Sequence, residues 1–560
     1  MSLLATTTSE ANFLWGHTTA RCFADLGVEV VFFSPGSRST PLVLGCEQEP
    51  RLSCFPLLDE RTAAFFALGH SKRTGTPPLL VCTSGSAPTH WYPAVTEASY
   101  SGVPLLILSA DRPPELQECG AGQTINQQHL FGSFVRKFYS APLPQKGLDS
   151  LAQLQSLIAQ SYSMATSLRP GPVHLNFAFR EPLWPNDPNL INLPDLPATS
   201  LPAQDKVTKN GEAPWIELTQ AKHPVIIAGL DCPADLPPLF DSIPILCDSL
   251  SPLRETQHPS RILRYENLLR CPKFTQSAQP DLFIVLGPLP TSKTLRSWIE
   301  QSGAERVVIE PSGRKVDPLT GPSRSLVLPY NQLSQLKLSP PSREWLKKWT
   351  DSEKTIDTKW EAEWDQLPFD SEPKIVRILS EKLPKDAFFF CANSMPIRDI
   401  EWFWKGGNLK RKLFGARGVN GIDGTLGTAM GLAHLAKQPA YLLTGDLAFL
   451  HDSNALLFSS DLIGSLTVFL INNHGGGIFE NLAVSQLPEF EKCFATPQSC
   501  DFEKLCSAHS VCYTLCKSES DLTSALLRPP SHGVHVIEIK TNRKTDQDVR
   551  RHLLSISPIS

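Results

Sequence analysis

Short apolar runs recur along the whole chain, and the segments between them have helix-like patterning. VEVVFF, PLLVCT and PLLILSA lie in the first third, PVIIAG, IPILCD, DLFIVLG and RVVIE in the middle, and AFFFCA, AYLLTG, LTVFLIN and VHVIEI in the last third. Short runs that are apolar throughout are typical of strands buried on both faces, as in parallel sheets covered by helices. The pattern therefore predicts an α/β protein with mostly parallel sheets.

The length of the chain and two changes in composition divide it into domains. A chain of 560 residues exceeds what one hydrophobic core usually holds. Residues 186–214 are rich in proline and polar residues, which predicts a linker. Residues 341–366 are charged and carry tryptophans, and we expect them to form a connecting helical segment. The predicted α/β domains then span residues 1–185, 215–340 and 367–560, and the central one is Rossmann-like.

Composition and charge exclude several classes of protein. A formal net charge of -4 gives no general attraction to nucleic acid. No apolar run approaches the ~18 residues of a membrane span, and the N-terminus lacks the basic and apolar regions of a signal peptide. The 14 cysteines include no C-x-x-C pair, and for the five that cluster over residues 493–516 buried thiols in a reducing compartment are favoured over a metal site. We therefore expect a cytoplasmic protein without a membrane span.

Polar residues and glycines follow two of the predicted strands in the last third. Asp446 comes directly after AYLLTG, and Asn473 follows LTVFLIN. Both fall at the carboxyl end of a parallel strand, the edge at which open α/β sheets bind ligands. A carboxylate, an amide oxygen and a backbone carbonyl of the next turn suit Mg²⁺, and Gly475, Gly476 and Gly477 allow backbone to approach phosphate. Each half alone could be a helix cap or a turn, but together they indicate a site.

Gly-Asp followed about thirty residues later by Asn-Asn resembles the metal and diphosphate motif of thiamine diphosphate enzymes. The resemblance implies that Asp446, Asn473 and the carbonyl of Gly475 bind Mg²⁺ or Mn²⁺. Leu447 stands where the common form has a second glycine, a departure that suits one branch of the superfamily.

Further motifs identify that branch. They are SPGSRSTPL at 34–42, LSADRPPEL at 108–116, GAGQTINQQHLFG at 120–132, CANSMPIRD at 391–399 and RGVNGIDGT at 417–425. Together with TGDLAFLHDSN and NNHGGGIF they resemble the MenD family, the succinyl-enolpyruvyl-hydroxycyclohexene-carboxylate synthases of menaquinone and phylloquinone biosynthesis. The central domain matches more thinly, through CDSLSPLR, GPLPTSKTLRSW and RKVDP.

Membership of this family implies a three-domain architecture and a reaction. The first domain would bind the pyrimidine of thiamine diphosphate and the last its diphosphate. The enzyme would decarboxylate 2-oxoglutarate and add the resulting succinyl carbanion equivalent to isochorismate. The family builds its active sites between subunits, so a homodimer or larger homo-oligomer is expected.

The resemblance also assigns roles to single residues. Glu60, at the start of an alanine-rich helix, would hydrogen-bond the pyrimidine nitrogen, although Asp59 and Glu60 could also simply favour a helix N-terminus. Ile422 would support the bent cofactor. The remaining cofactor-binding residues are Gly445, Asp446, Leu447, Asn473, Gly475, Gly476, Gly477 and Ile478. Residues matching the isochorismate side are Ser37, Arg38, Arg112, Gln123 and Lys293. Residues near the oxoacid or along the pocket wall are Ser394, Arg398, Arg417, Phe479 and Leu482.

Two alternatives stay open from the sequence. The nearer is another thiamine diphosphate enzyme, such as an acetolactate synthase or a simple 2-oxoacid decarboxylase, and the proposed recognition of two acidic substrates by arginines argues against it. The more distant is a non-catalytic phosphate-binding or regulatory α/β protein, in which the loss of Glu60 or Asp446 would be expected. Both residues are present.

Overall fold

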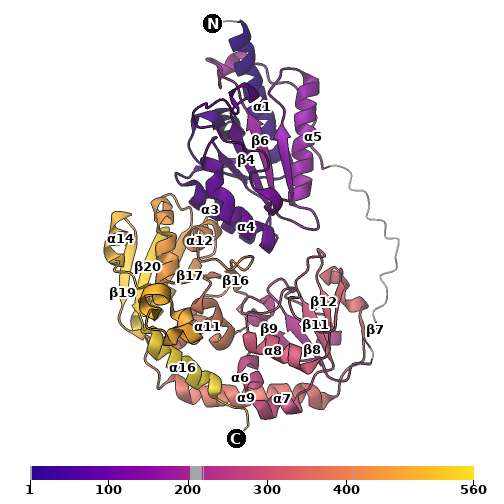
Figure 1. Ribbon diagram of the computed structural model, residues 1–560, viewed down its shortest axis with the longest axis vertical. Helices are drawn as coiled ribbons and strands as arrows, with labels where there is room; N and C mark the ends of the chain where they lie inside the picture. Colours follow the sequence, from indigo (N-terminus) through magenta and orange to yellow (C-terminus); the bar gives the residue numbers. More distant parts are fainter. Residues whose placement is uncertain (1–2, 202–216, 219, 408, 560) are drawn as a thin grey trace. The chain divides into compact units, whose positions relative to one another are not determined.

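The computed structural model describes residues 3–201, 217–218, 220–407 and 409–559 (Figure 1). Of the linker predicted over residues 186–214, residues 202–214 lie outside this range. The chain divides into two compact units. Unit 1 comprises residues Met1–Thr208, Ala416–His434 and His451–Leu462, and unit 2 comprises Lys209–Gly415, Leu435–Leu450 and Ile463–Ser560. Within the described ranges, no helix is both long enough and apolar enough to cross a membrane.

Unit 1 contains a parallel six-stranded sheet in the order β2-β1-β3-β4-β6-β5. Helix α1 packs against α2 and α5 on one side, and α3 packs against α4. Strands β3 and β4 are buried along their whole length, which explains their uninterrupted apolar sequences. The strands are β1 (Val30–Phe33), β2 (Ser53–Pro56), β3 (Leu79–Cys82), β4 (Leu105–Asp111), β5 (Lys137–Ala141) and β6 (Pro172–Ala178). The helices are α1 (Leu3–Asp25), α2 (Thr40–Glu47), α3 (Glu60–Thr74), α4 (Tyr92–Ser101) and α5 (Leu148–Ala165).

The first sheet of unit 2 is also parallel and has the order β10-β9-β8-β11-β12-β13. The order reverses between β8 and β11, as in a doubly wound Rossmann-like sheet. Its strands are β8 (Pro224–Ala228), β9 (Ile245–Cys247), β10 (Arg261–Ile262), β11 (Leu282–Leu286), β12 (Glu305–Ile309) and β13 (Ser323–Leu326). Its helices are α6 (Tyr265–Arg270), α7 (Pro272–Ser277) and α8 (Lys293–Ser302), and a separate short pair joins β7 (Glu217–Leu218) to β14 (Lys337–Leu338).

The second sheet of unit 2 has the order β16-β15-β17-β18-β20-β19. In chain order this arrangement repeats that of unit 1, so the first and last sheets share one topology. The strands are β15 (Phe388–Cys391), β16 (Lys412–Gly415), β17 (Ala440–Gly445), β18 (Ser465–Asn472), β19 (Cys512–Cys516) and β20 (Gly533–Lys540). The helices are α10 (Glu372–Lys382), α11 (Met395–Phe403), α13 (Asp446–His451), α14 (Phe502–Ala508), α15 (Glu519–Leu527) and α16 (Arg543–Ser555). Helix α12 (Thr425–Ala433) is assigned to unit 1.

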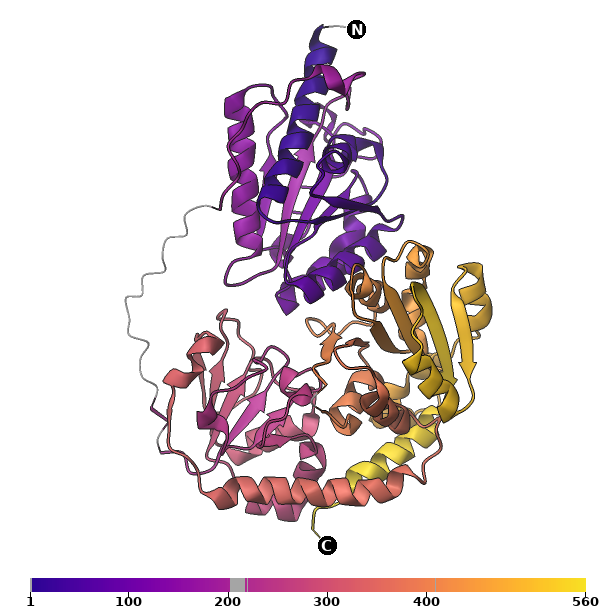
Figure 2. The ribbon, with the colours of Figure 1, turned by 180° about the vertical axis from the view of Figure 1, so that it is seen from behind.

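One long helix, α9 (Arg343–Trp364), extends from below one sheet of unit 2 to below the other, along the lower edge of Figures 1 and 2. The indole N–H of Trp345 donates to the carbonyl of Pro224, which begins β8, at 2.8 Å. The indole N–H of Trp360 donates to the carbonyl of Leu553 in α16 at 3.1 Å. The tryptophans that marked this segment in the sequence therefore bury its apolar face in a core shared by both sheets.

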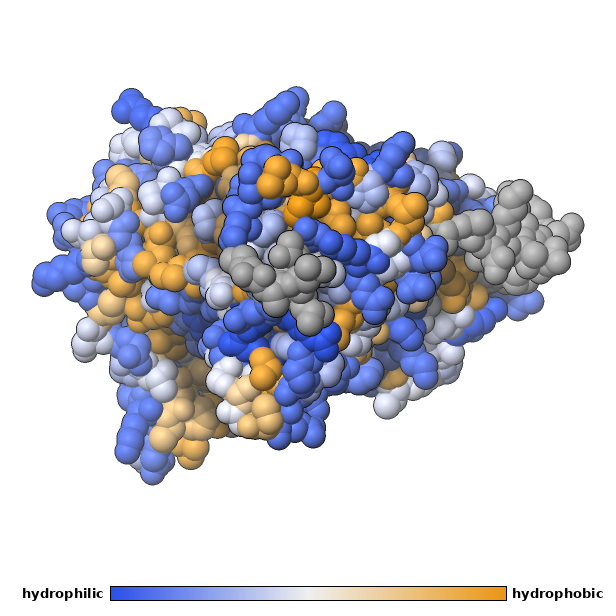
Figure 3. Space-filling view, turned by 90° about the horizontal axis from the view of Figure 1, so that it is seen from above, coloured by the Kyte–Doolittle hydropathy of each residue, from blue (hydrophilic) through white to orange (hydrophobic). Residues whose placement is uncertain are grey.

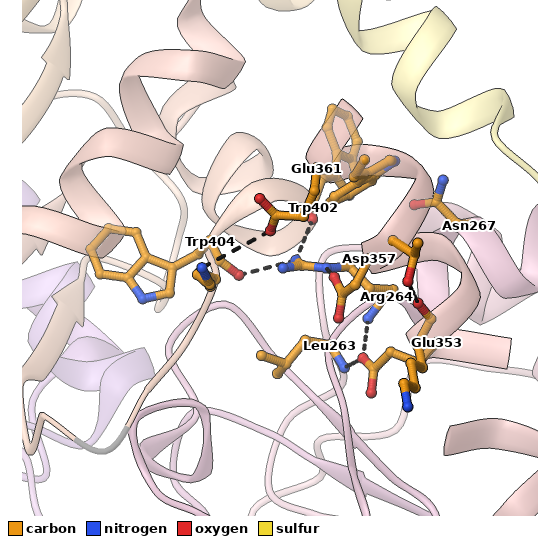
Figure 4. Close-up of polar contacts among 12 residues, drawn as sticks. Leu263, Arg264, Asn267, Glu353, Asp357, Glu361, Trp402 and Trp404 are labelled. Carbon is orange, nitrogen blue, oxygen red and sulfur yellow. Dashed lines mark hydrogen bonds and ion pairs between the residues drawn. The ribbon is translucent and has the colours of Figure 1, made fainter. Parts of the chain in front are cut away.

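Ion pairs reinforce the same junction (Figure 4). The Arg264 guanidinium donates to Asp357 of α9 at 2.8 Å and to the carbonyls of Trp402 and Trp404 at 3.1 Å each. Glu353 of α9 accepts the backbone N–H of Arg264 at 2.8 Å. Burial raises the pKa of Glu353 to about 7 because a buried carboxylate loses its hydration. The Arg264 side chain thus links α9 to the backbone at the end of α11, which belongs to the second sheet of unit 2.

The fold confirms the predicted α/β class with three parallel sheets. Each apolar run singled out in the sequence contains a strand. Other strands were not predicted. Some, such as β2 at the edge of its sheet, mix polar and apolar residues, and others are interrupted by polar residues. In β6 the interrupting residues His174 and Asn176 are buried and both bond Ser109 at 2.7 Å, so the fold satisfies polarity that the sequence pattern could not interpret.

Candidate active site

Asp446 begins α13 directly after β17, at the carboxyl edge of its sheet. The side chain is buried; its Oδ1 accepts the N–H of Leu447 at 2.7 Å, and its Oδ2 accepts the N–H of Gly475 at 2.9 Å. Burial raises the pKa of Asp446 to about 6, since the carboxylate loses hydration. The bond from Gly475 brings the Gly-Asp and Asn-Asn segments together.

Asn473 follows β18, the strand that pairs with β17 so that Gly445 lies opposite Ile471. Its Nδ2 donates to Oε1 of Glu372 at 2.7 Å. Its Oδ1 is buried and accepts no hydrogen bond from any residue that the structure describes. An unsatisfied buried acceptor costs about 1–3 kcal/mol, so this oxygen is suited to a ligand that the chain itself does not provide.

Gly475 has a backbone conformation that other residues cannot adopt here. Its φ is 123°, and a Cβ at this position would lie 2.1 Å from the carbonyl oxygen of Ala495. With the carboxylate of Asp446 and the amide oxygen of Asn473, the carbonyl of Gly475 offers the all-oxygen donor set that Mg²⁺ or Mn²⁺ prefers. The residues present therefore fit a divalent cation.

The other residues predicted to bind cofactor or line the pocket at this edge surround the same turn. Gly445 ends β17, and Leu447 is half-buried in α13. Gly476 is buried, and residues 477–481 form a 3₁₀ turn. In that turn Gly477 is buried, and Ile478 and Phe479 are half-buried. Leu482 follows it and is 39% exposed, which leaves it accessible as a wall residue.

Ser394 lies between β15 and α11, Arg398 lies in the first turn of α11, and β15 neighbours β17. Ser394 precedes α11 with φ 74°, a left-handed conformation that is strained for serine and is found at functional sites. Arg398 donates from Nη1 to the carbonyl of Ser394 at 2.6 Å. The two predicted oxoacid residues thus share one carboxyl edge with Asp446 and Asn473.

In unit 1, Glu60 is the first residue of α3 and is half-buried. Asp59 caps this helix, because its carboxylate accepts the N–H groups of Arg61 at 2.8 Å and Thr62 at 3.2 Å. No hydrogen bond or ion pair among the described residues involves the Glu60 carboxylate. Burial raises the pKa of the Cys82 thiol, and the negative charge of nearby Glu60 raises it further. Asp59 therefore takes the capping role and leaves Glu60 available.

Arg38 and Arg112 form a second polar cluster at the carboxyl edge of the unit 1 sheet. Arg38 is 3% exposed and donates to the carbonyl of Phe179 at 2.9 Å and to Glu181 at 2.8 Å. Its Nε is buried and bonds no described residue. Burial and the nearby Arg112 guanidinium lower the pKa of Arg38. Two adjacent guanidiniums with an unused buried donor favour an anionic ligand.

The other residues predicted for the isochorismate side are divided between the two units. Ser37 is exposed beside Arg38. Gln123 is exposed, has φ 56° and donates to the carbonyl of Ser84 at 3.1 Å. Lys293 is exposed at the start of α8 and belongs to unit 2, so its place in this group stays a prediction.

Arg417 and Ile422 lie in the segment 416–434 of unit 1, and both are half-buried. The sequence did not identify what holds this segment. Glu97 of α4, which is 2% exposed, accepts the N–H groups of Gly418 at 2.9 Å and Val419 at 2.8 Å. A carboxylate within an ordinary helical pattern gives no sign of such a distant partner.

Glycines let α12, which follows Ile422, cross α3 closely. A Cβ at Gly431 would lie 1.9 Å from the carbonyl oxygen of Phe66, and a Cβ at Gly69 would lie 1.9 Å from that of Thr428. The helix that begins with Glu60 is therefore held against the helix that follows Ile422.

Comparison with known proteins identifies the family. Residues 15–130 match the N-terminal TPP binding domain of thiamine pyrophosphate enzymes, and residues 405–539 match their C-terminal TPP binding domain. The chain is 39% identical to the 2-succinyl-5-enolpyruvyl-6-hydroxy-3-cyclohexene-1-carboxylate synthase of Synechococcus elongatus over 97% of this chain and 96% of that protein. The chain is also 39% identical to the synthase of a Nostoc species, over 97% of each protein. It is 38% identical to that of Thermosynechococcus vestitus, over 98% of this chain and 99% of that protein. The chain belongs to this synthase family.

Membership confirms the resemblance inferred from the motifs and makes the chain a thiamine diphosphate enzyme. The structure adds residues to the predicted synthase site. Arg543 of α16 donates to the carbonyl of His474 at 2.7 Å and to Glu480 at 2.7 Å, so it fixes the glycine turn. Glu372 bonds Asn473. Each lies far along the chain from its partner, and no local signal in the sequence predicts the contact.

Proposed function

We propose that the chain catalyses the reaction after which its family is named. It decarboxylates 2-oxoglutarate and transfers the four-carbon succinyl remainder to isochorismate by conjugate addition. The product is 2-succinyl-5-enolpyruvyl-6-hydroxy-3-cyclohexene-1-carboxylate, in menaquinone or phylloquinone biosynthesis. The observation that carries this proposal is the 39% identity over 97% of the chain to a synthase of that name.

Bound thiamine diphosphate would supply a thiazolium ring that accepts the electron pair left when an oxoacid loses carbon dioxide. In our proposal Asp446, Asn473 and the Gly475 carbonyl hold Mg²⁺ or Mn²⁺. The buried Asn473 Oδ1, which lacks a partner in the described chain, supports this assignment. The turn formed by Gly475, Gly476 and Gly477 admits the diphosphate close to backbone N–H groups.

Glu60 would hold a proton at the pyrimidine nitrogen. Its carboxylate makes no hydrogen bond or ion pair with the described residues, since Asp59 caps the helix, and this favours a ligand contact. Ile422 would support the cofactor from the segment that Glu97 anchors.

Substrate recognition in this proposal rests on arginines. Arg38 and Arg112, with Ser37, Gln123 and Lys293, would bind the carboxylates of isochorismate. Ser394, Arg398 and Arg417 would bind the oxoacid. The guanidiniums of Arg38 and Arg112 lie close together at the carboxyl edge of the unit 1 sheet, and the buried Nε of Arg38 bonds no described residue. In this proposal they form charge-assisted hydrogen bonds to a substrate carboxylate.

We further propose a homodimer or larger homo-oligomer with active sites between subunits. Leu58, two residues before Glu60, is 64% exposed, and Val419 beside Arg417 is 43% exposed. In the proposed oligomer a partner subunit covers these two side chains, which lie close in sequence to proposed site residues. Hydrophobic residues also reach the surface among hydrophilic ones on the face drawn in Figure 3. The cytoplasmic location stays a prediction.

The proposal is tested by incubating the purified protein with thiamine diphosphate, Mg²⁺, 2-oxoglutarate and isochorismate. We expect the condensed product by mass spectrometry, together with carbon dioxide. Carbon dioxide from 2-oxoglutarate without any adduct would favour a simple decarboxylase, and acetolactate formed in a parallel incubation with pyruvate would favour an acetolactate synthase. Either result would refute the proposed reaction.

The metal assignment has its own test. Asp446→Ala removes the only anionic ligand of the proposed set and should abolish Mg²⁺-dependent binding of thiamine diphosphate in calorimetric titration. Unchanged affinity in a folded Asp446→Ala variant would show that the cation binds elsewhere.

A further inference from the structure

The amide of Asn473 has two chemically opposite ends in different surroundings. Its Nδ2 donates to Oε1 of Glu372 at 2.7 Å, whereas its Oδ1 is buried and without a partner in the described chain. Glu372 is 4% exposed. An ionised carboxylate only accepts hydrogen bonds, so it attracts the NH₂ end of the amide and turns the oxygen to the opposite side.

A buried network of hydrogen bonds and ion pairs keeps the Glu372 side chain in place. Arg550 of α16 forms an ion pair with Oε2 of Glu372, the oxygen that does not face Asn473. Thr541 donates to Oε1 at 3.2 Å. The N–H of Glu372 donates to Asp546 of α16 at 3.0 Å. The Glu372 and Arg550 side chains are 5% and 3% exposed, so little solvent screens their pairing.

The same arginine reaches the helix that carries the predicted oxoacid residues. Arg550 donates from Nε and Nη2 to the two oxygens of Asp399 at 2.7 and 2.6 Å. Asp399 is 1% exposed and directly follows Arg398 in α11. Helices α10, α11 and α16 therefore meet around one guanidinium.

We propose that Glu372 is a positioning residue that orients Asn473 so that its oxygen faces a divalent cation shared with Asp446. The proposal rests on the metal site proposed above and deepens it. Glu372 does not touch the cation; it selects which end of the Asn473 amide does. Arg550 enforces the selection because its N–H groups hold one Glu372 oxygen and leave the other for Asn473.

Substitutions that exchange the carboxylate of Glu372 and the amide of Asn473 test this proposal. In Glu372→Gln, Arg550 binds the new amide oxygen, so the new NH₂ group faces Asn473 and turns the Asn473 oxygen away from the cation. In Asn473→Asp, two carboxylates face each other at hydrogen-bond distance and repel. In the double variant Glu372→Gln/Asn473→Asp, the Gln NH₂ donates to one Asp oxygen and leaves the other for the cation.

The readout is Mn²⁺ binding in the presence of thiamine diphosphate, followed by the electron paramagnetic resonance signal of free Mn²⁺. Loss of a residue that orients a metal ligand typically weakens metal binding about 10- to 100-fold, and we expect Glu372→Gln to show a loss in this range. Asn473→Asp should also bind Mn²⁺ more weakly than the wild type. The double variant should bind Mn²⁺ more tightly than either single variant. Glu381→Gln is a matched control, because Glu381 lies in the same helix and also pairs with an arginine, Arg377. Its Mn²⁺ affinity should equal that of the wild type.

Three outcomes separate the possibilities. A double variant that binds Mn²⁺ no better than Asn473→Asp overturns the positioning role, and this comparison holds even if Glu372→Gln alone fails to fold. Wild-type affinity in folded Glu372→Gln overturns it as well. If Asp446→Ala leaves Mn²⁺ affinity unchanged, the proposed metal site itself fails, which is a different result from either.

Discussion

Replacing Glu255 with alanine should destabilise the contact between the two sheets of unit 2. Glu255 lies in the central part of the chain and is 2% exposed. Its carboxylate accepts Nε and Nη2 of Arg411 at 2.9 and 3.0 Å and the indole N–H of Trp404 at 2.6 Å. The Arg411 side chain is fully buried and stacks over the Trp404 ring at 5.1 Å. Glu255, which directly follows the CDSLSPLR motif, therefore forms a buried ion pair with Arg411, which directly precedes β16.

The magnitude follows from what Glu255→Ala leaves behind. Removing one partner of a buried ion pair costs about 3–5 kcal/mol, because the remaining charge is neither hydrated nor paired. Each kcal/mol shifts the melting temperature of a 150–250-residue domain by roughly 2–4 °C. Unit 2 is larger than such a domain, so the shift per kcal/mol lies at the lower end of this range, and we expect its unfolding transition to fall by roughly 5–10 °C.

Differential scanning calorimetry measures this shift, and the exposed pair Arg324–Glu305 provides the control. Its side chains are each 44% exposed and 3.2 Å apart, so Glu305→Ala should cost at most about 1 kcal/mol. The double variant Glu255→Met/Arg411→Met should recover most of the loss, because apolar residues often replace a buried ion pair without cost. Equal shifts for Glu255→Ala and Glu305→Ala would refute the reasoning.

Three further predictions concern catalysis and pH. Glu60→Gln should still bind cofactor but lower both decarboxylation and condensation about 10²- to 10⁴-fold; deuterium exchange at the thiazolium carbon as fast as in the wild type would exclude Glu60 as the activating acid. Arg38→Ala should lower kcat/KM for isochorismate by roughly 10- to 100-fold, the loss of a charge-assisted bond, with 2-oxoglutarate decarboxylation nearly unchanged; steady-state kinetics that show equal losses would assign Arg38 to a shared step or to the fold. Burial lowers the pKa of His70 to about 3 and of His434 to about 4. The unfolded chain takes up protons at the ordinary histidine pKa of 6.5, whereas the folded chain does so only at the depressed values, so acid favours the unfolded state. The folded state therefore keeps its full stability above pH 6.5 and loses part of it as the pH falls toward 4 for His434 and toward 3 for His70. At pH 5 the loss is roughly 2 kcal/mol per histidine, and His434→Phe should remove its share in melting curves at pH 7.5 and 5; an unchanged pH dependence would contradict this cause.

The sequence by itself determined the fold class and predicted the sheet edge at which the candidate site lies. Strands such as β4 and β17 are apolar throughout because both of their faces are buried, and burial alone produces that local signal. Asp446 and Asn473 were identified because each directly follows such a strand, and parallel strands bring their carboxyl ends to one edge. The structure joins them through the bond between Gly475 and Asp446.

Only the tertiary structure decided which polar side chains hold that site in place. Glu372, Arg550 and Glu97 lie in helices whose sequences read as ordinary amphipathic segments, yet all three are almost fully buried. Glu372 bonds Asn473, and Glu97 bonds the chain beside Arg417, across long separations in the sequence. A charged side chain can be buried without a large loss of stability only when a partner lies beside it in the interior. That partner comes from the packing of distant helices, which no local pattern of residues encodes.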